Sequence, residues 1–219
     1  LNIENSKLIE VIPEFKDQFF LSSAYQDALY GIYVTPDRPA EVALIANAKL
    51  ENLTQHNELL LGQYELGATN EINYKSPDDM EIQGWYITPP NFDESKKYPL
   101  ILAIHGGPHA MYRPAFRYSW QQFASDGYVV LFTNPRGSTG YGSEFANVID
   151  NDYPGSGDLS DLLSGVDYLA AKGFIDESKM YVQGCSGGGV LTAWVVGHDD
   201  RFAAAASLCP VTNWISMVG

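Results

Sequence analysis

The segment that most restricts the fold of this chain is residues 184–188, GCSGG, in which three glycines surround a serine. It follows a short apolar run, residues 179–184, and precedes a run of helical character, residues 187–197. A serine on a sharp turn between a strand and a helix has a strained backbone, and side chains two positions away on either side would collide there. The glycine spacing therefore predicts a strand-turn-helix unit with Ser186 presented on the turn.

The rest of the second half alternates between strand and helix patterns. Near-continuous apolar runs are typical of strands that are buried on both faces. The expected strands cover residues 100–107, 128–137, 179–184 and 202–210, and the expected helices cover residues 119–127, 158–173 and 187–197. Strands that alternate with helices indicate an α/β fold, with a mostly parallel sheet and helices on both faces.

The front of the chain has a different pattern. Residues 28–35, 40–47 and 49–55 are short β-rich runs separated by turns, which predicts a meander of about three antiparallel strands. The meander could be a small sheet domain or one blade of a β-propeller, and a single blade needs further sequence to cover its faces. Residues 71–90 form the next expected hairpin, so we place a domain boundary at residue 70.

Composition excludes several classes of protein. The chain has 13 basic and 27 acidic residues and a net charge of −14, which argues against nucleic-acid binding. No apolar run approaches the roughly 20 residues of a membrane helix, and the histidines and cysteines lack metal-binding spacing. We therefore expect no nucleic acid, membrane, metal or cofactor, while cytoplasmic and periplasmic or secreted locations both remain open.

Ser186 is the candidate nucleophile, because the N-terminus of the following helix favours a developing negative charge. The alternative is a purely structural glycine turn. Residues 105–108, HGGP, end an expected buried strand and leave bare N–H groups near the same edge of the sheet. Acyl transfer needs two oxyanion donors, and we expect them to be the N–H groups of Gly187 and Gly107. Cys185 is expected to be a buried filler.

The partners of Ser186 are harder to find. In an α/β-hydrolase an acidic residue and then a histidine follow the serine along the chain, but only residues 187–219 follow it here. His198 ends the expected helix, about 18 Å away at about 1.5 Å per residue, whereas a general base must lie within about 3 Å. We therefore expect a fragment whose catalytic acid and histidine lie beyond Gly219.

Four motifs together resemble the prolyl oligopeptidase family of serine peptidases, notably its acylaminoacyl-peptidase and dipeptidyl-peptidase branches. They are HGGPHAMY (105–112), NPRGSTGYG (134–142), GCSGGG (184–189) and RFAAAASLCPVTNW (201–214). The resemblance implies that residues 71–219 are the front part of an α/β-hydrolase catalytic domain. It also implies that residues 1–70 are the end of the β-propeller that precedes this domain in the family.

The resemblance also implies roles for individual residues. Ser186 matches the nucleophile, and His105 stands where dipeptidyl peptidases have a tyrosine that donates to the oxyanion, so we expect His105 to face the substrate. Val211 and Trp214 match a P-V-x-x-W motif that lines the primary specificity pocket, although both could be ordinary core residues. Arg136 is expected to be architectural, on a tight turn where it pins neighbouring loops.

The leading hypothesis is a serine peptidase that hydrolyses short peptides through an acyl-enzyme on Ser186. A carboxylesterase of the same fold and a catalytically inactive binding or structural module are the alternatives. The expected partner is a peptide substrate. Exposed strand edges are open templates for pairing, so we also expect homo-oligomers or stabilisation by another piece of chain.

Overall fold

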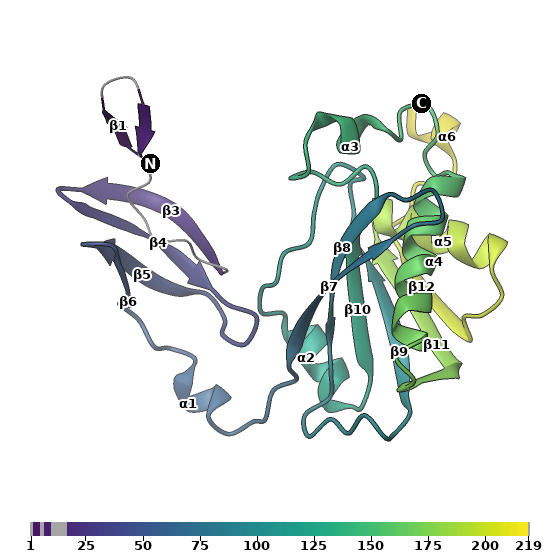
Figure 1. Ribbon diagram of the computed structural model, residues 1–219, viewed down its shortest axis with the longest axis horizontal. Coiled ribbons are helices and arrows are strands. Elements are labelled where there is room, and N and C mark those ends of the chain that lie inside the picture. The colour runs from purple at the N-terminus through teal and green to yellow at the C-terminus, as the bar shows by residue number, and fades with distance from the viewer. Residues whose placement is uncertain (1, 5–6, 10–16, 219) are drawn as a thin grey trace. The chain divides into compact units, whose positions relative to one another are not determined.

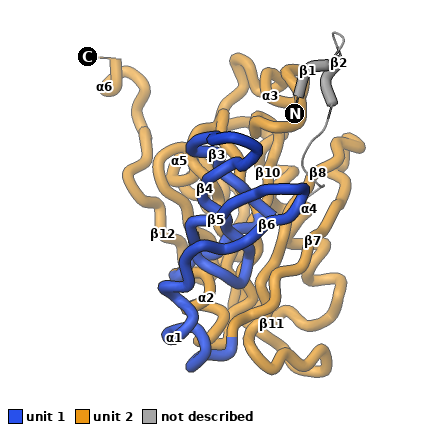
Figure 2. The backbone as a smooth tube through the Cα atoms, turned by 90° about the vertical axis from the view of Figure 1, so that its left-hand side faces the viewer, with its two compact units in different colours: residues 1–65, 114–118 blue, residues 66–113, 119–219 orange. Residues whose placement is uncertain are grey.

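The computed structural model describes residues 2–4, 7–9 and 17–218 of the chain. It divides into two compact units, Leu1–Glu65 with Pro114–Tyr118, and Leu66–Arg113 with Ser119–Gly219 (Figure 2). The chain thus passes between the units a few residues before the expected boundary at residue 70. The short segment of the first unit that comes from the middle of the sequence was not foreseen.

The first unit contains a four-stranded antiparallel sheet in the order β3-β4-β5-β6. Its strands are β3 (Gln18–Tyr25), β4 (Ala28–Val34), β5 (Glu41–Ala46) and β6 (Lys49–Asn52), followed by helix α1 (Glu58–Leu61). Strands β1 (Asn2–Glu4) and β2 (Lys7–Ile9) form a separate antiparallel pair. The expected meander is present with one more strand, β3, while its assignment to a β-propeller stays a prediction.

Two sets of hydrogen bonds connect the parts of the first unit. The Phe116 N–H donates to the Thr35 carbonyl at 2.8 Å, which attaches the inserted segment to the end of β4. The buried Glu41 carboxylate accepts hydrogen bonds from the Thr54 hydroxyl and from the Asn57 backbone and side chain. These donors, Thr54 first, lower the pKa of Glu41 to about 2, so its charge is stabilised within the folded unit.

The second unit is built on a six-stranded mixed sheet in the order β12-β11-β9-β10-β8-β7 (Figure 1). Its strands are β7 (Thr69–Lys75), β8 (Glu81–Ile87), β9 (Tyr98–Ile104), β10 (Val129–Asn134), β11 (Ile175–Cys185) and β12 (Ala204–Leu208). Strands β12, β11, β9 and β10 are parallel, and the expected hairpin of β7 and β8 adds antiparallel strands beside β10.

Helices cover both faces of this sheet, as expected. Val129 and Leu131 of β10 pack on the side of α4 (Ser156–Ala170) and α5 (Gly187–His198). Val130 and Phe132 point the other way, toward α2 (Tyr118–Ser125). Successive side chains of a strand alternate between faces, so one apolar strand supplies both cores. No helix in the described part of the chain is both long and apolar enough to span a membrane.

Strand β12 differs from its expectation. It forms where the apolar run at residues 202–210 predicted a buried strand, but all five of its residues are exposed. It occupies the edge of the sheet, where only β11 pairs with it. The short helices α1, α3 (Ser143–Asn147) and α6 (Trp214–Val218) were also not foreseen, because four or five residues carry little periodicity.

Candidate active site

Ser186 lies on a sharp turn between a strand and a helix. Strand β11 ends at Cys185 and helix α5 begins at Gly187, with Ser186 between them at φ 59° and ψ −123°. Positive φ is uncommon for a residue with a side chain and is strained. The Ser186 N–H donates to the Leu208 carbonyl at 2.9 Å, which fixes the turn to the end of β12. The predicted strand-turn-helix unit is confirmed.

The glycines around Ser186 are required by close backbone approaches. A Cβ on Gly184 would lie 2.3 Å from the Gly188 carbonyl oxygen, and one on Gly188 would lie 2.3 Å from the Ile104 carbonyl oxygen. Backbone atoms cannot rotate away as a side chain can, so any larger residue would push the strand and helix apart. The sequence GCSGG is therefore a packing requirement of this turn.

The loop after β9 packs directly against the serine turn. A Cβ on Gly106 would lie 3.4 Å from the Ser186 Cβ, and one on Gly187 would lie 2.9 Å from the Gly107 nitrogen. Gly107 has φ 121°, a conformation that favours glycine. The structure thus brings Ser186, Gly187 and Gly107 together at one end of the sheet. Their roles as nucleophile and oxyanion donors stay predictions.

His105 lies beside this group, but its ring is engaged by the chain itself. The Nδ1–H donates to the Gly106 carbonyl at 2.7 Å, and Nε2 lies 2.9 Å from the Ser138 hydroxyl. The residue is buried, and burial lowers its pKa below the usual range. Both ring nitrogens thus lie within hydrogen-bonding distance of the chain's own oxygen atoms, and contact of this side chain with a substrate stays a prediction.

The other described histidines of this unit also contact backbone carbonyl oxygens away from Ser186. His109 Nδ1 lies 3.1 Å from the Gly137 carbonyl oxygen, and the His198 Nδ1–H donates to the Trp194 carbonyl at 2.8 Å. His198 is exposed at the far end of α5, as the sequence predicted. Within residues 17–218, no histidine forms a hydrogen bond with Ser186.

Tyr153 is a neighbour of the serine turn that the sequence did not reveal. Its hydroxyl donates to the Gly187 carbonyl at 2.9 Å, across a separation of 34 residues. Burial raises the pKa of Tyr153 well above its usual range, so the phenol keeps its proton. The Trp194 indole N–H donates to the Gly155 carbonyl at 3.1 Å. Two hydrogen bonds thus fasten the loop before α4 to the start and middle of α5.

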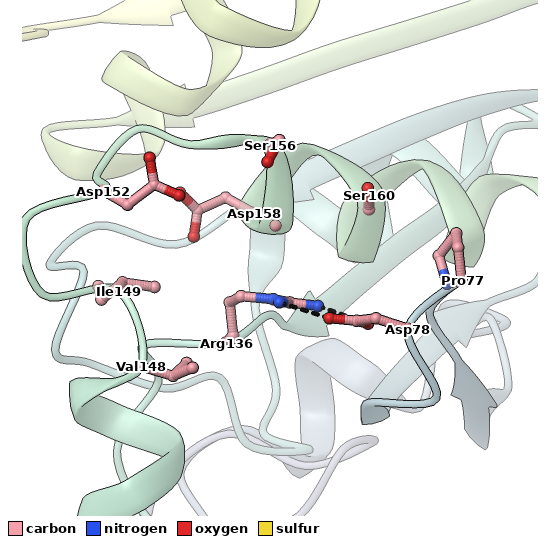
Figure 3. Close-up of a pocket in the computed structure, with 10 residues that line it drawn as sticks. Pro77, Asp78, Arg136, Val148, Ile149, Asp152, Ser156, Asp158 and Ser160 are labelled. Carbon is pink, nitrogen blue, oxygen red and sulfur yellow. Dashed lines mark hydrogen bonds and ion pairs between the residues drawn. The ribbon is translucent and has the colours of Figure 1, made fainter.

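Arg136 pins neighbouring segments, as predicted. Its backbone N–H and two guanidinium nitrogens donate to both oxygens of Asp161 at 2.8 to 2.9 Å. The same guanidinium donates to both oxygens of Asp78, also at 2.8 and 2.9 Å (Figure 3). The Asp161 side chain is fully buried, whereas that of Asp78 is 55% exposed. One arginine therefore joins the turn after β10 to α4 and to the β7–β8 hairpin.

A cavity of about 270 Å³ lies beside Arg136 and is lined also by Asp152 and Asp158 (Figure 3). Asp158 Oδ2 accepts the Gly155 N–H at 2.8 Å and so caps α4, while its buried Oδ1 has no hydrogen-bond partner. Burial, with the charges of Asp161 and Asp152, raises the pKa of Asp158 to about 7. No group of residues that could hold a metal ion occurs in the described chain.

The residues expected to line a specificity pocket lie after β12. Val211 is half-buried, and Trp214 is 50% exposed at the start of α6. Their contact with a substrate stays a prediction. Cys185 is exposed, in contrast to the buried filler expected, and its sulfur lies 2.7 Å from that of Cys209.

Comparison with known proteins identifies this arrangement. The sequence profile of the prolyl oligopeptidase family matches residues 114–219. Peptidase YuxL of Bacillus subtilis, described as uncharacterized, is 37% identical over 213 residues, which make up 96% of this chain and 32% of that protein. Residues 114–219 belong to the prolyl oligopeptidase family.

Other proteins that are similar to this chain are named peptidases. Dipeptidyl-peptidase 5 of Porphyromonas gingivalis is 32% identical over 170 residues, covering 76% of this chain and 25% of that protein. The acylaminoacyl peptidase of Pyrococcus horikoshii matches with a TM-score of 0.83 and 32% identity, over 94% of this chain and 33% of that one. The chain thus spans a quarter to a third of the length of these relatives.

Proposed function

We propose that the protein carrying this chain is a serine peptidase that cleaves short peptides through an acyl-enzyme on Ser186. The observation that carries the proposal is the strained turn that presents Ser186 against the backbone of Gly107 and Gly187. Relatives named dipeptidyl-peptidase and acylaminoacyl peptidase support a peptide substrate. The same combination of turn and glycine loop is the nucleophile arrangement of α/β-hydrolases.

In this proposal the Ser186 hydroxyl oxygen attacks the carbonyl carbon of the peptide bond. The carbonyl oxygen becomes an oxyanion that accepts hydrogen bonds from the N–H groups of Gly187 and Gly107. At the first position of α5 the N–H of Gly187 has no acceptor within the helix, which leaves it free for this role. The amine product then leaves, and water hydrolyses the ester on Ser186.

The proton of Ser186 needs a base that residues 17–218 do not place beside it. We propose that the catalytic acid and histidine follow residue 219 in a longer protein, and that the four-stranded sheet of the first unit is part of a β-propeller. A blade of a propeller is a four-stranded antiparallel sheet, which agrees with β3 to β6. Without the base, the isolated chain should keep only a small residual rate.

A fluorophosphonate probe tests the proposal, because it reacts with an activated serine. A longer natural protein carrying these residues should be labelled on Ser186, and a Ser186→Ala variant should not. Ser138→Ala is the matched control, since Ser138 is buried and donates to the Pro135 carbonyl. Labelling or peptide-anilide hydrolysis that persists in Ser186→Ala would refute the assignment.

A further inference from the structure

The two cysteines of the chain meet at the carboxyl ends of neighbouring strands. In the parallel pair of β11 and β12, Cys185 lies opposite Leu208, and Cys209 is the next residue along the chain. Cys209 has φ 40°, which turns the chain at the end of β12. The two sulfur atoms lie 2.7 Å apart, within 1 Å of the roughly 2.0 Å length of a disulfide bond.

We propose that Cys185 and Cys209 form an oxidisable dithiol site, which closes to a disulfide by exchange with a small-molecule disulfide such as oxidised glutathione. Both residues are exposed in the described chain, so a tripeptide disulfide can reach them. Neighbouring strands lie about 4.8 Å apart, and disulfides join Cα atoms about 4.4 to 6.8 Å apart. The pairing of Cys185 with Leu208, together with the turn at Cys209, therefore brings the two sulfur atoms to 2.7 Å.

The exchange proceeds in two steps. One cysteine thiolate attacks a sulfur of oxidised glutathione, which breaks that disulfide and releases one glutathione thiolate that takes up a proton. The protein then carries a mixed disulfide. The second cysteine, as its thiolate, attacks the protein sulfur of the mixed disulfide and expels the second glutathione. The two protein thiols are oxidised, and one glutathione disulfide is reduced to two thiols.

The position of this site gives it a consequence for its surroundings. Cys185 immediately precedes Ser186, and Cys209 precedes the segment of Val211 and Trp214. A bond between them would join the serine turn covalently to the segment that follows β12. The Ser186 N–H already donates to the Leu208 carbonyl at 2.9 Å, so the disulfide would reinforce an existing link. This inference rests on the strand pairing, the sulfur contact and the exposure of both cysteines, and it does not require catalysis by Ser186.

The experiment uses the reduced chain at mildly alkaline pH, because the hydrogen bond to Cys209 raises the pKa of the Cys185 thiol. After incubation with oxidised glutathione, acid quenching and alkylation, intact-mass analysis should show a monomer that has lost two hydrogen atoms and carries no alkyl group. Peptide mapping should recover the Cys185–Cys209 link. The variants Cys185→Ser and Cys209→Ser should each stop at a mixed disulfide with glutathione.

The folded arrangement is tested by repeating the exchange in concentrated urea. Because β11 and β12 hold the thiols together, the ratio of internal disulfide to mixed disulfide should fall at least tenfold on unfolding. Circular dichroism checks that the reduced wild type and both serine variants fold. The proposal is overturned if the folded chain accumulates two glutathione adducts, disulfide-linked dimers or unreacted thiols, or if unfolding leaves the ratio unchanged.

Discussion

The ion pairs of Arg136 permit a quantitative prediction of stability, because this side chain binds one buried and one exposed carboxylate. Asp161 is fully buried and accepts three hydrogen bonds from Arg136 and one from the Ser76 hydroxyl at 2.6 Å. Asp161→Asn leaves the guanidinium, 11% exposed, without its buried counter-charge. Breaking a buried ion pair by removing one partner costs about 3–5 kcal/mol, so we expect a loss of that size in the free energy of unfolding.

Two further variants, at residues that bind Arg136 or Asp161, should cause smaller losses in the free energy of unfolding. Asp78→Asn removes a partner whose side chain is 55% exposed, and solvent-exposed ion pairs contribute about 0.2–1 kcal/mol. Ser76→Ala removes a single buried hydrogen bond to the charged Asp161, worth about 2 kcal/mol. The predicted order of destabilisation is therefore Asp161→Asn, then Ser76→Ala, then Asp78→Asn.

Urea unfolding followed by tryptophan fluorescence measures these losses, since Trp85 and Trp120 are buried in the same unit. The midpoint should move to lower urea while the slope stays constant, because the surface exposed on unfolding is unchanged. If Asp161→Asn does not fold, the remaining two variants still test the order. An Asp78→Asn loss that equals or exceeds that of Asp161→Asn or Ser76→Ala would show that burial does not govern this cluster.

Three further changes probe the turn and the cavity, each by urea unfolding. Gly184→Ala places a Cβ 2.3 Å from a backbone carbonyl and should cost about 3 kcal/mol or more, whereas the control Gly197→Ala, with open space, should be neutral or stabilising. Asp158 has a raised pKa of about 7, so its cost to stability grows as the pH rises from about 4 to 7. Asp158→Asn should remove this slope and raise the free energy of unfolding at pH 8 by on the order of 4 kcal/mol, since each pKa unit corresponds to about 1.4 kcal/mol. An unchanged slope would contradict the assignment. Tyr153→Phe removes the hydrogen bond to the Gly187 carbonyl and should lower the free energy of unfolding by about 1 kcal/mol. The control Tyr64→Phe, at an exposed residue, should leave it unchanged.

Much of the second unit could be predicted from local patterns. The apolar runs predicted β9, β10 and β11, and the helical spacing predicted α2, α4 and α5. Each predicted range lies within a few residues of the observed bounds. The four-strand sheet of the first unit was only partly foreseen. Strand β3 was not predicted, because its apolar residues Phe20 and Leu21 are exposed and do not mark a buried face. A strand without a buried face has no strong alternation for the sequence to show.

The exposure of β12 shows the limit of reading burial from composition. Its alanine-rich run has the apolar character of an interior strand, yet it lies at the sheet edge in the described chain. Composition reports which side chains tolerate burial, and the arrangement of neighbouring strands decides whether they are covered. The engaged ring of His105 is a similar case, since its partner Ser138 is 33 residues away.

The sequence by itself determined the conformation at Ser186, because the sterics of a tight turn act between residues only two positions apart. The tertiary structure alone decided that Tyr153 fastens Gly187, that Arg136 joins Asp161 to Asp78, and that Cys185 meets Cys209. These contacts connect segments 24 to 58 residues apart. They depend on the order and register of strands, which no short-range pattern in the chain specifies.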